Sequence, residues 1–143
     1  MMDFTGAAEE LMALQAALHR LPMNAEISRM ASGELFVLYH LLTHDGQASP
    51  KELSREMMVS TARVAALLNN MESKSLVRRF PDPADSRKVI VSLTEEGREL
   101  VERGRARVLS MLSRVLESIG PEDTLELIRI QKKLLGCLAP RNC

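Results

Sequence analysis

The stretch from Leu53 to Gly97 constrains this chain most, because it reads as two helices and two strands in close succession. Within it, residues 60–73 predict a helix with two unlike faces. Apolar side chains recur at helical spacing along one face: Val64, Leu67, Leu68 and Met71. The opposite face is small or polar, with Ala62, Ala66 and Asn69 flanked by Arg63, Ala65 and Asn70. Such a face can approach a flat, hydrogen-bonding surface closely, and the major groove of DNA offers one.

The residues before this helix predict a helix-turn-helix. Ser49 and Glu52 form a capping box with Pro50 at the first helical position, so we expect a helix to begin at Pro50. Ser60 can cap the second helix after only a short turn. Two short helices joined in this way place the second one for recognition of DNA.

The residues after this helix predict a basic β-hairpin. Leu76-Val77 lead into Arg78-Arg79, residues 81–88 are rich in proline and turn formers, and residues 88–93 alternate as in a half-buried strand. A basic hairpin beside a recognition helix forms a wing. Arg87 near its tip could enter a minor groove, whose negative potential attracts arginine.

This stretch resembles the winged-helix domain of the MarR (multiple antibiotic resistance regulator) family of transcription factors. The residues that carry the resemblance are Glu52-Leu53-Ser54, the helix 60–71, Leu76-Val77, Asp85-x-Arg87 and Leu93-Thr94-x-x-Gly97. The family usually has glycine where this chain has Ser75, and often has arginine where it has Ala66. In architecture the resemblance extends to nearly the whole chain. It implies a mainly α fold, a winged helix-turn-helix with a small β-hairpin wing and a helical dimerisation lobe.

The charge distribution agrees with a DNA-binding stretch in the middle of the chain. The 143 residues carry 19 basic and 19 acidic side chains, so the net charge is zero. Residues 51–88 nevertheless hold eight basic and five acidic side chains, whereas residues 1–50 hold two basic and six acidic. A local basic patch is sufficient for contacts with phosphate, so the zero net charge does not exclude a nucleic-acid binder.

Apolar periodicity and capping signals predict the remaining helices. We expect a helix over residues 5–21 ended by Pro22, a polar connection over 23–30, and a second helix capped by Ser32 and stopped at Asp45-Gly46. Thr94 should cap a long helix that Gly120-Pro121 breaks, and a last helix should run to Leu138. We therefore divide the chain into a DNA-binding lobe, residues 32–97, and a dimerisation lobe, residues 1–31 and 98–143.

The terminal helices carry apolar stripes that one layer of helices cannot bury alone, so they need a partner. The resemblance implies a homodimer with both termini at the interface. A two-fold dimer would read two half-sites, so we expect a near-palindromic operator in double-stranded DNA. The alternative is a monomer in which these helices pack on one another.

The function we expect is that of a ligand-responsive transcriptional repressor. The candidate DNA-binding residues are Ser60, Thr61, Ala62, Arg63, Ala65, Ala66, Asn69, Asp85, Arg87 and Lys88. The resemblance implies a small aromatic or phenolic effector between the two lobes. The sequence does not identify it, and we expect no cofactor.

Other functions have weaker support in the sequence. His40 and His44 have the i, i+4 spacing of a metal pair, which leaves a metal-sensing regulator as an alternative, but no further ligands are evident. A winged helix that docks a protein is the second alternative. Cys137 and Cys143 do not suggest a disulfide framework, and a role in sensing is open. We find no catalytic constellation, and we expect a cytoplasmic protein because no membrane span or signal peptide is apparent.

Overall fold

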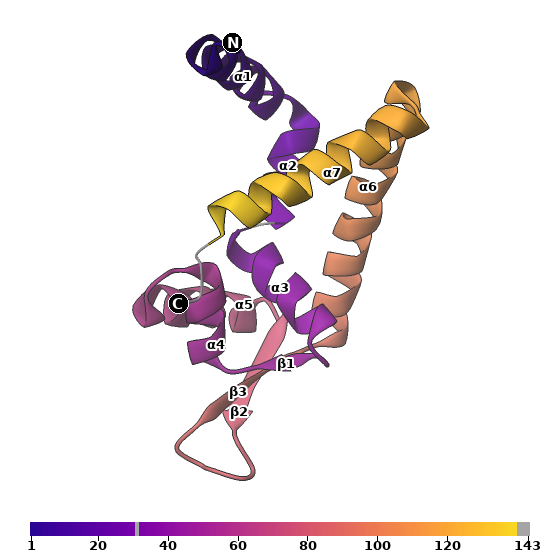
Figure 1. Ribbon diagram of the computed structural model, residues 1–143. Helices are drawn as coiled ribbons and strands as arrows, with labels where there is room; N and C mark the ends of the chain where they lie inside the picture. Colours follow the sequence, from indigo (N-terminus) through magenta and orange to yellow (C-terminus); the bar gives the residue numbers. More distant parts are fainter. Residues whose placement is uncertain (31, 140–143) are drawn as a thin grey trace. The chain divides into compact units, whose positions relative to one another are not determined.

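The computed structural model describes residues 1–30 and 32–139 of the chain. In chain order the elements are α1 Phe4–His19, α2 Pro22–Met30, α3 Gly33–Thr43, β1 Gln47–Ala48, α4 Pro50–Met57, α5 Thr61–Ser73, β2 Val77–Pro81, β3 Val89–Leu93, α6 Glu95–Ile119 and α7 Pro121–Leu138. Figure 1 shows a mainly helical chain in which β2 and β3 form a hairpin that protrudes beside α4 and α5. The predicted fold class, mainly α with a winged helix-turn-helix, is confirmed.

The helix-turn-helix consists of α4 and α5, and both predicted caps are present. Ser49 Oγ accepts a hydrogen bond of 3.1 Å from the Glu52 amide, and Ser60 Oγ accepts one of 3.2 Å from the Arg63 amide. Between the helices, Met58 adopts a left-handed conformation with φ of 57°, which lets the chain turn after α4. The serine at each N-cap thus satisfies one of the amides that a helix start leaves unpaired.

The sheet has the antiparallel order β1-β3-β2, in which β2 and β3 form the wing. β1 was not predicted, because a two-residue strand is too short to show alternation. It pairs Gln47 with Ser92 and Ala48 with Val91. Of the alternating residues in β3, Val91 is fully buried, whereas Val89 is 41% exposed because it lies where the hairpin leaves the core.

One segment was predicted wrongly. Residues 23–30, expected to be a polar connection, belong to the helix α2. Pro22 does not merely end the preceding helix; it occupies the first position of α2, where its missing N–H costs no hydrogen bond. Ser32 does flank α3, but its Oγ donates to the Ser28 carbonyl instead of capping the helix with its side chain.

The hydrophobic core of the winged helix-turn-helix forms around α3, α5 and the sheet. Its buried side chains come from seven elements and adjoining loops: Val37, Leu38, Leu41, Ala48, Leu53, Val64, Leu68, Met71, Leu76, Val77, Val91 and Val101. The start of α6 joins this core. Thr94 Oγ1 caps the helix by accepting from the Gly97 amide at 3.0 Å and donates to the Leu76 carbonyl at 2.9 Å, so α6 is attached to the beginning of the wing.

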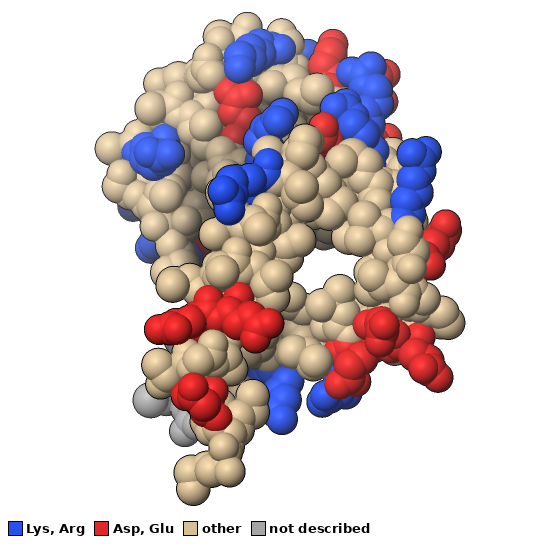
Figure 2. Space-filling model, turned by 90° about the horizontal axis from the view of Figure 1, so that it is seen from above, with Lys and Arg blue, Asp and Glu red and all other residues tan. Residues whose placement is uncertain are grey.

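The chain divides by its internal contacts into two compact units, Met1–Val108 and Leu109–Cys143. Several leucines in and just after α1 are about half exposed within the first unit: Leu11, Leu14, Leu18 and Leu21. In the second unit α7 likewise exposes Leu127, Ile130, Leu134 and Leu138. Figure 2 shows broad uncharged areas on one face of the molecule. Among the described residues, no helix has the length and hydropathy that crossing a membrane requires.

Candidate nucleic-acid interface

Helix α5 has the two unlike faces that its sequence predicts. Val64, Leu68 and Met71 are buried to within 1% of their surface, and Leu67 is partly buried. The predicted contact residues are all exposed: Ser60, Thr61, Ala62, Arg63, Ala65, Ala66 and Asn69. The small alanines let the backbone of α5 come close to a neighbouring surface. These seven residues include no large apolar side chain and no acidic group, so they suit an anionic, hydrogen-bonding partner.

The C-terminal end of α5 is braced against α3 by Glu34. The Glu34 carboxylate accepts a hydrogen bond of 2.6 Å from Asn70 Nδ2 and one of 3.0 Å from Lys74 Nζ. Glu34 is only 25% exposed, so these bonds are partly shielded from water. The brace connects the start of α3 to the recognition helix, and it was not predicted because 36 residues separate Glu34 from Asn70.

A second set of hydrogen bonds, the Arg79 bracket, connects α5 to the wing. Glu72 Oε2 accepts from both the backbone amide of Arg79, at 3.0 Å, and its Nε, at 3.2 Å. The same guanidinium also donates to Asn69 Oδ1. The Arg79 hydrogen bonds hold the pKa of the Glu72 carboxyl below its ordinary value. Sequence reasoning placed Arg79 in the wing but missed this contact, since only the packing of β2 beside α5 creates it.

The loop at the tip of the wing presents Arg87 to solvent. The Arg87 side chain is 89% exposed, and its Nε donates to Asp85 Oδ1 at 3.1 Å, as does its backbone amide. These hydrogen bonds lower the pKa of Asp85 from its ordinary value. The loop is closed by a bond of 2.9 Å from the Asp82 amide to the Lys88 carbonyl, and Lys88 is also exposed. The ten predicted residues therefore fall into two groups, one along α5 and one at the wing tip.

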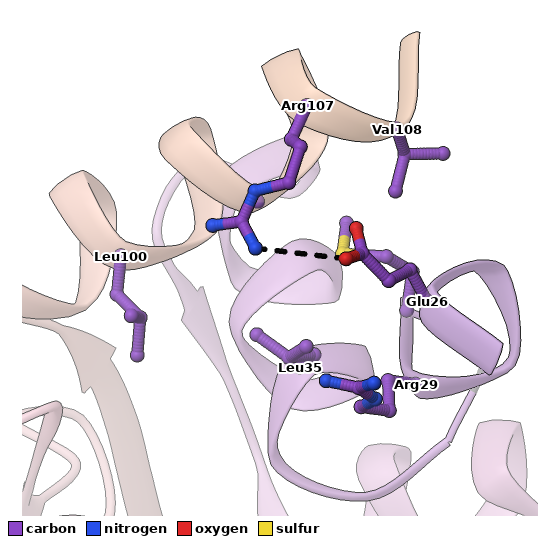
Figure 3. Close-up of a pocket in the computed structure, with 8 residues that line it drawn as sticks. Glu26, Arg29, Leu35, Leu100, Arg107 and Val108 are labelled. Carbon is purple, nitrogen blue, oxygen red and sulfur yellow. Dashed lines mark ion pairs between the residues drawn. The ribbon is translucent and has the colours of Figure 1, made fainter. Parts of the chain in front are cut away.

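A small cavity lies among α2, α3 and α6, within the first unit (Figure 3). Its volume is about 110 Å³, and its lining is Glu26, Arg29, Met30, Leu35, Leu100, Gly104, Arg107 and Val108. Arg107 Nη1 lies 3.7 Å from Glu26 Oε1, and Figure 3 shows these side chains reaching toward each other across the opening. Two arginines and one glutamate give the lining an excess of one positive charge beside apolar walls.

Of the predicted histidine pair, His40 lies on α3 and His44 is its C-cap residue, and the two rings are stacked at a centroid distance of 3.9 Å. His40 is buried, its Nε2 has no hydrogen-bond partner, and the nearest carboxylate oxygen, on Glu52, is 3.8 Å away. Within residues 1–30 and 32–139 no group of three or more potential ligands could hold a metal ion. Cys137 is exposed, and Cys143 lies outside the described residues.

A helix-turn-helix followed by a β-hairpin that carries a basic tip defines a winged helix-turn-helix protein. The model of the MarR family matches residues 27–88. The HTH-type transcriptional regulator YdgJ of Bacillus subtilis is 28% identical over 89% of this chain and 77% of its own. The HTH-type transcriptional repressor NicR of Pseudomonas putida is 31% identical over 70% of this chain, which spans 63% of NicR. A MarR family protein from Bacillus stearothermophilus has the same fold, with a TM-score of 0.75, 24% identity, and coverage of 98% of this chain and all of its own.

Over residues 27–88 the chain matches the MarR family of transcriptional regulators. The family resemblance expected from residues 52–97 is thereby confirmed. Because the relatives are transcriptional regulators, the expectation of a regulator rather than an enzyme is confirmed as well.

Proposed function

We propose that this protein is a homodimeric transcriptional repressor that binds a near-palindromic operator in double-stranded DNA and releases it when a small aromatic ligand binds. The observation that carries this proposal is the exposed face of α5, which is small and polar, together with the fully exposed arginine at the wing tip. NicR, a relative of similar sequence, is a transcriptional repressor. A regulator of this kind acts on DNA inside the cell, so we place it in the cytoplasm.

We assign DNA contacts to residues 32–97 and dimerisation to residues 1–31 and 98–143. In the major groove, Ser60 and Thr61 would bind phosphate at the start of α5, where helix amides favour anions. Ala62, Ala65 and Ala66 would allow close approach and contact with thymine methyl groups, while Arg63 and Asn69 would reach base edges. In the minor groove, Asp85 would orient Arg87, and Lys88 would add a nearby phosphate contact.

The apolar surfaces of α1 and α7 support the homodimer. Their leucines and isoleucines are 42–79% exposed in a single chain, and Leu109, Val115 and Ile119 of α6 are 41–47% exposed. Exposed apolar side chains that recur along a helix mark a site of association. A second copy with the same stripes is the natural partner, and two-fold symmetry would then match the two halves of a palindrome.

The cavity of Figure 3 supports the effector site. Its volume of about 110 Å³ is comparable to an engineered cavity of about 150 Å³ that accepts benzene, so a single aromatic ring is the right size. The excess positive charge of Arg29 and Arg107 over Glu26 favours a ring that carries a carboxylate or a phenolate. Occupation of this site would move α2 and α6 relative to α3, which holds α5 through Glu34.

The alternative of a protein-docking winged helix predicts large apolar residues on the outer face of α5. The outer face instead carries alanines, Arg63 and two asparagines, so the surface favours DNA. A metal-sensing regulator would need further ligands near His40 and His44, and no such group lies in the described part of the chain.

The test is selection of random duplex DNA by the purified protein, followed by titration of the enriched site against salt. We expect a near-palindrome whose binding weakens steeply with salt, because phosphate contacts release counterions. Benzoate and phenol are then added to the complex, with cyclohexanol as an uncharged, non-aromatic control, and should lower the affinity. Enrichment of no sequence would reject the DNA-reading proposal, whereas enrichment without a ligand effect would reject only the effector site.

A further inference from the structure

The bracket between the wing and the recognition helix fixes the orientation of an exposed asparagine. The Glu72 carboxylate accepts two hydrogen bonds from Arg79, one from the backbone amide and one from Nε. The terminal nitrogen Nη2 of Arg79 then donates to Asn69. The Arg79 side chain is 28% exposed, so it is more shielded than the other wing arginine, Arg87, which is 89% exposed. Arg79 is therefore packed between the wing and α5 and does not extend freely into solvent.

The chemistry of the two groups determines which end of the Asn69 amide faces Arg79. A guanidinium has five N–H donors and no acceptor, so only the carbonyl oxygen of an asparagine can bind it. The Asn69 Oδ1 accordingly accepts from Arg79, and the Nδ2 amino group is turned away. Within the described part of the chain, Nδ2 makes no hydrogen bond. Asn69 thus presents its amino donors, and one of the two lone pairs of its oxygen is already used by Arg79.

We propose that Arg79 is a specificity-determining residue, which turns the Asn69 oxygen toward itself and leaves the amino group as the main hydrogen-bonding group for the bases. This inference rests on the proposed function, in which the outer face of α5 reads the major groove. An unrestrained asparagine favours adenine, because its oxygen accepts from N6 while its amino group donates to N7. With Oδ1 turned toward the Arg79 guanidinium, whose N–H donors compete with the adenine N6 amino group for this oxygen, that pair of bonds is disfavoured. Asn69 then favours guanine or thymine, whose groove edges present acceptors, and disfavours cytosine.

The experiment compares the base preferences of variants on the duplex that the wild-type protein enriches. Asn69→Ala identifies the base pair that Asn69 reads, because preference should disappear at that position alone. Arg79→Met removes every donor of the guanidinium but keeps an unbranched apolar stem and the backbone bond to Glu72. We expect this variant to gain about tenfold in relative affinity for adenine at the identified position, as a bidentate contact is no longer disfavoured. Glu72→Gln weakens the hold on Arg79 without removing it and should give a smaller gain.

The matched control is Arg78→Met, which removes the same charge from the neighbouring position of β2. Arg78 is exposed and is not part of the bracket, so its replacement should leave the base preference unchanged. Circular dichroism and thermal unfolding of each variant show that it remains folded.

Three results would overturn the inference. One is a wild-type preference for adenine at the position identified with Asn69→Ala. Another is an Arg79→Met variant whose affinity falls uniformly for all sequences, with a salt slope lower by about one, as expected for a simple phosphate contact. The third is an Asn69→Ala variant that changes no base preference, which would reject the role of Asn69 while leaving DNA recognition intact. Failure of the wild-type protein to enrich any DNA would reject the proposed function and, with it, this inference.

Discussion

At the scale of single residues, a local ion pair between Asp85 and Arg87 positions the arginine at the tip of the wing. Asp85 accepts hydrogen bonds from both the backbone and the side chain of Arg87, so the loop holds its arginine in a defined position while almost all of the side chain stays in water. Because the folded-state pKa of Asp85 is lowered, the pair is present above the ordinary aspartate pKa and is lost only as the pH falls through the lowered value. Near neutral pH the pair is intact.

The replacement Arg87→Ala should weaken binding to all DNA sequences and lower the salt slope by about one unit, because one cation near the phosphates is lost. The measurement is a salt titration of operator binding by fluorescence anisotropy. Arg103→Ala, which removes an exposed arginine from α6 outside the wing and α5, serves as the control. An unchanged slope in Arg87→Ala would remove the wing tip from the binding mechanism.

At the scale of elements, the recognition helix is fixed from two sides. Glu34 of α3 holds its C-terminal end through Asn70 and Lys74, and Arg79 of β2 holds it through Glu72 and Asn69. Both brackets join segments that are distant in sequence but share one hydrophobic core. They restrict the orientation of α5 and of its exposed face.

We expect Glu34→Ala to lower the free energy of unfolding by about 1 kcal/mol, since a charged hydrogen bond and a half-exposed ion pair are lost. Operator affinity should fall as well, because α5 loses one of its supports. Chemical unfolding and operator titration measure the two effects separately. The exposed Glu9 of α1 is the control position, where alanine should change neither quantity. Normal DNA affinity in a destabilised Glu34→Ala would show that the brace serves stability alone.

The two glycines of α6 provide a matched pair of variants. A Cβ at Gly97 would overlap the Leu76 carbonyl oxygen and approach Leu93 Cδ1 to 2.9 Å, whereas a Cβ at Gly104 would meet only Met30 Sδ, at 3.8 Å. Gly97→Ala should therefore lower the free energy of unfolding by about 2 kcal/mol through overpacking. Gly104→Ala should raise it by about 0.5–1 kcal/mol, as alanine favours a helix interior. Urea unfolding at one protein concentration measures both, and equal effects would refute the close packing at Gly97.

At the scale of the whole molecule, a single chain leaves much apolar surface of its terminal helices exposed. Leu134 of α7 is 43% exposed and Leu14 of α1 is 55% exposed, although both belong to regular apolar stripes. Burial of a leucine stabilises association by about 1.5–3 kcal/mol, and a two-fold interface would count each leucine twice. The proposed dimer is thus the arrangement in which burial of these apolar side chains stabilises the protein most.

Leu134→Glu should raise the dissociation constant of the dimer at least about 100-fold, because two apolar side chains leave the interface and two carboxylates would enter it. Sedimentation velocity over a range of concentrations measures this change. Lys132→Glu, which introduces the same carboxylate on the same helix outside the stripe, should leave the dimer intact. A wild-type protein that sediments as a monomer at all concentrations would contradict the proposal.

Helix-capping residues and apolar periodicity, both local in the sequence, predicted most of the helices and strands. Ser49, Ser60 and Thr94 cap the helices that they were expected to cap, and the apolar spacing of α5 predicted which face is buried. Capping and periodicity act over three or four residues, so they can be read from neighbouring positions. The helix α2 was missed because proline signals both the end of one helix and the start of another, and the short β1 carried no alternation.

Only the tertiary structure decided the contacts between segments that are distant in the chain. The brackets Glu34–Asn70 and Arg79–Asn69 depend on how α3 and β2 pack against α5, and polar side chains of these types have no periodicity that would reveal a partner. The cavity among α2, α3 and α6 likewise exists only where three helices meet. The sequence thus determined that this chain carries a helix-turn-helix and a wing, whereas packing decided how α5 is held and that the Asn69 oxygen faces Arg79.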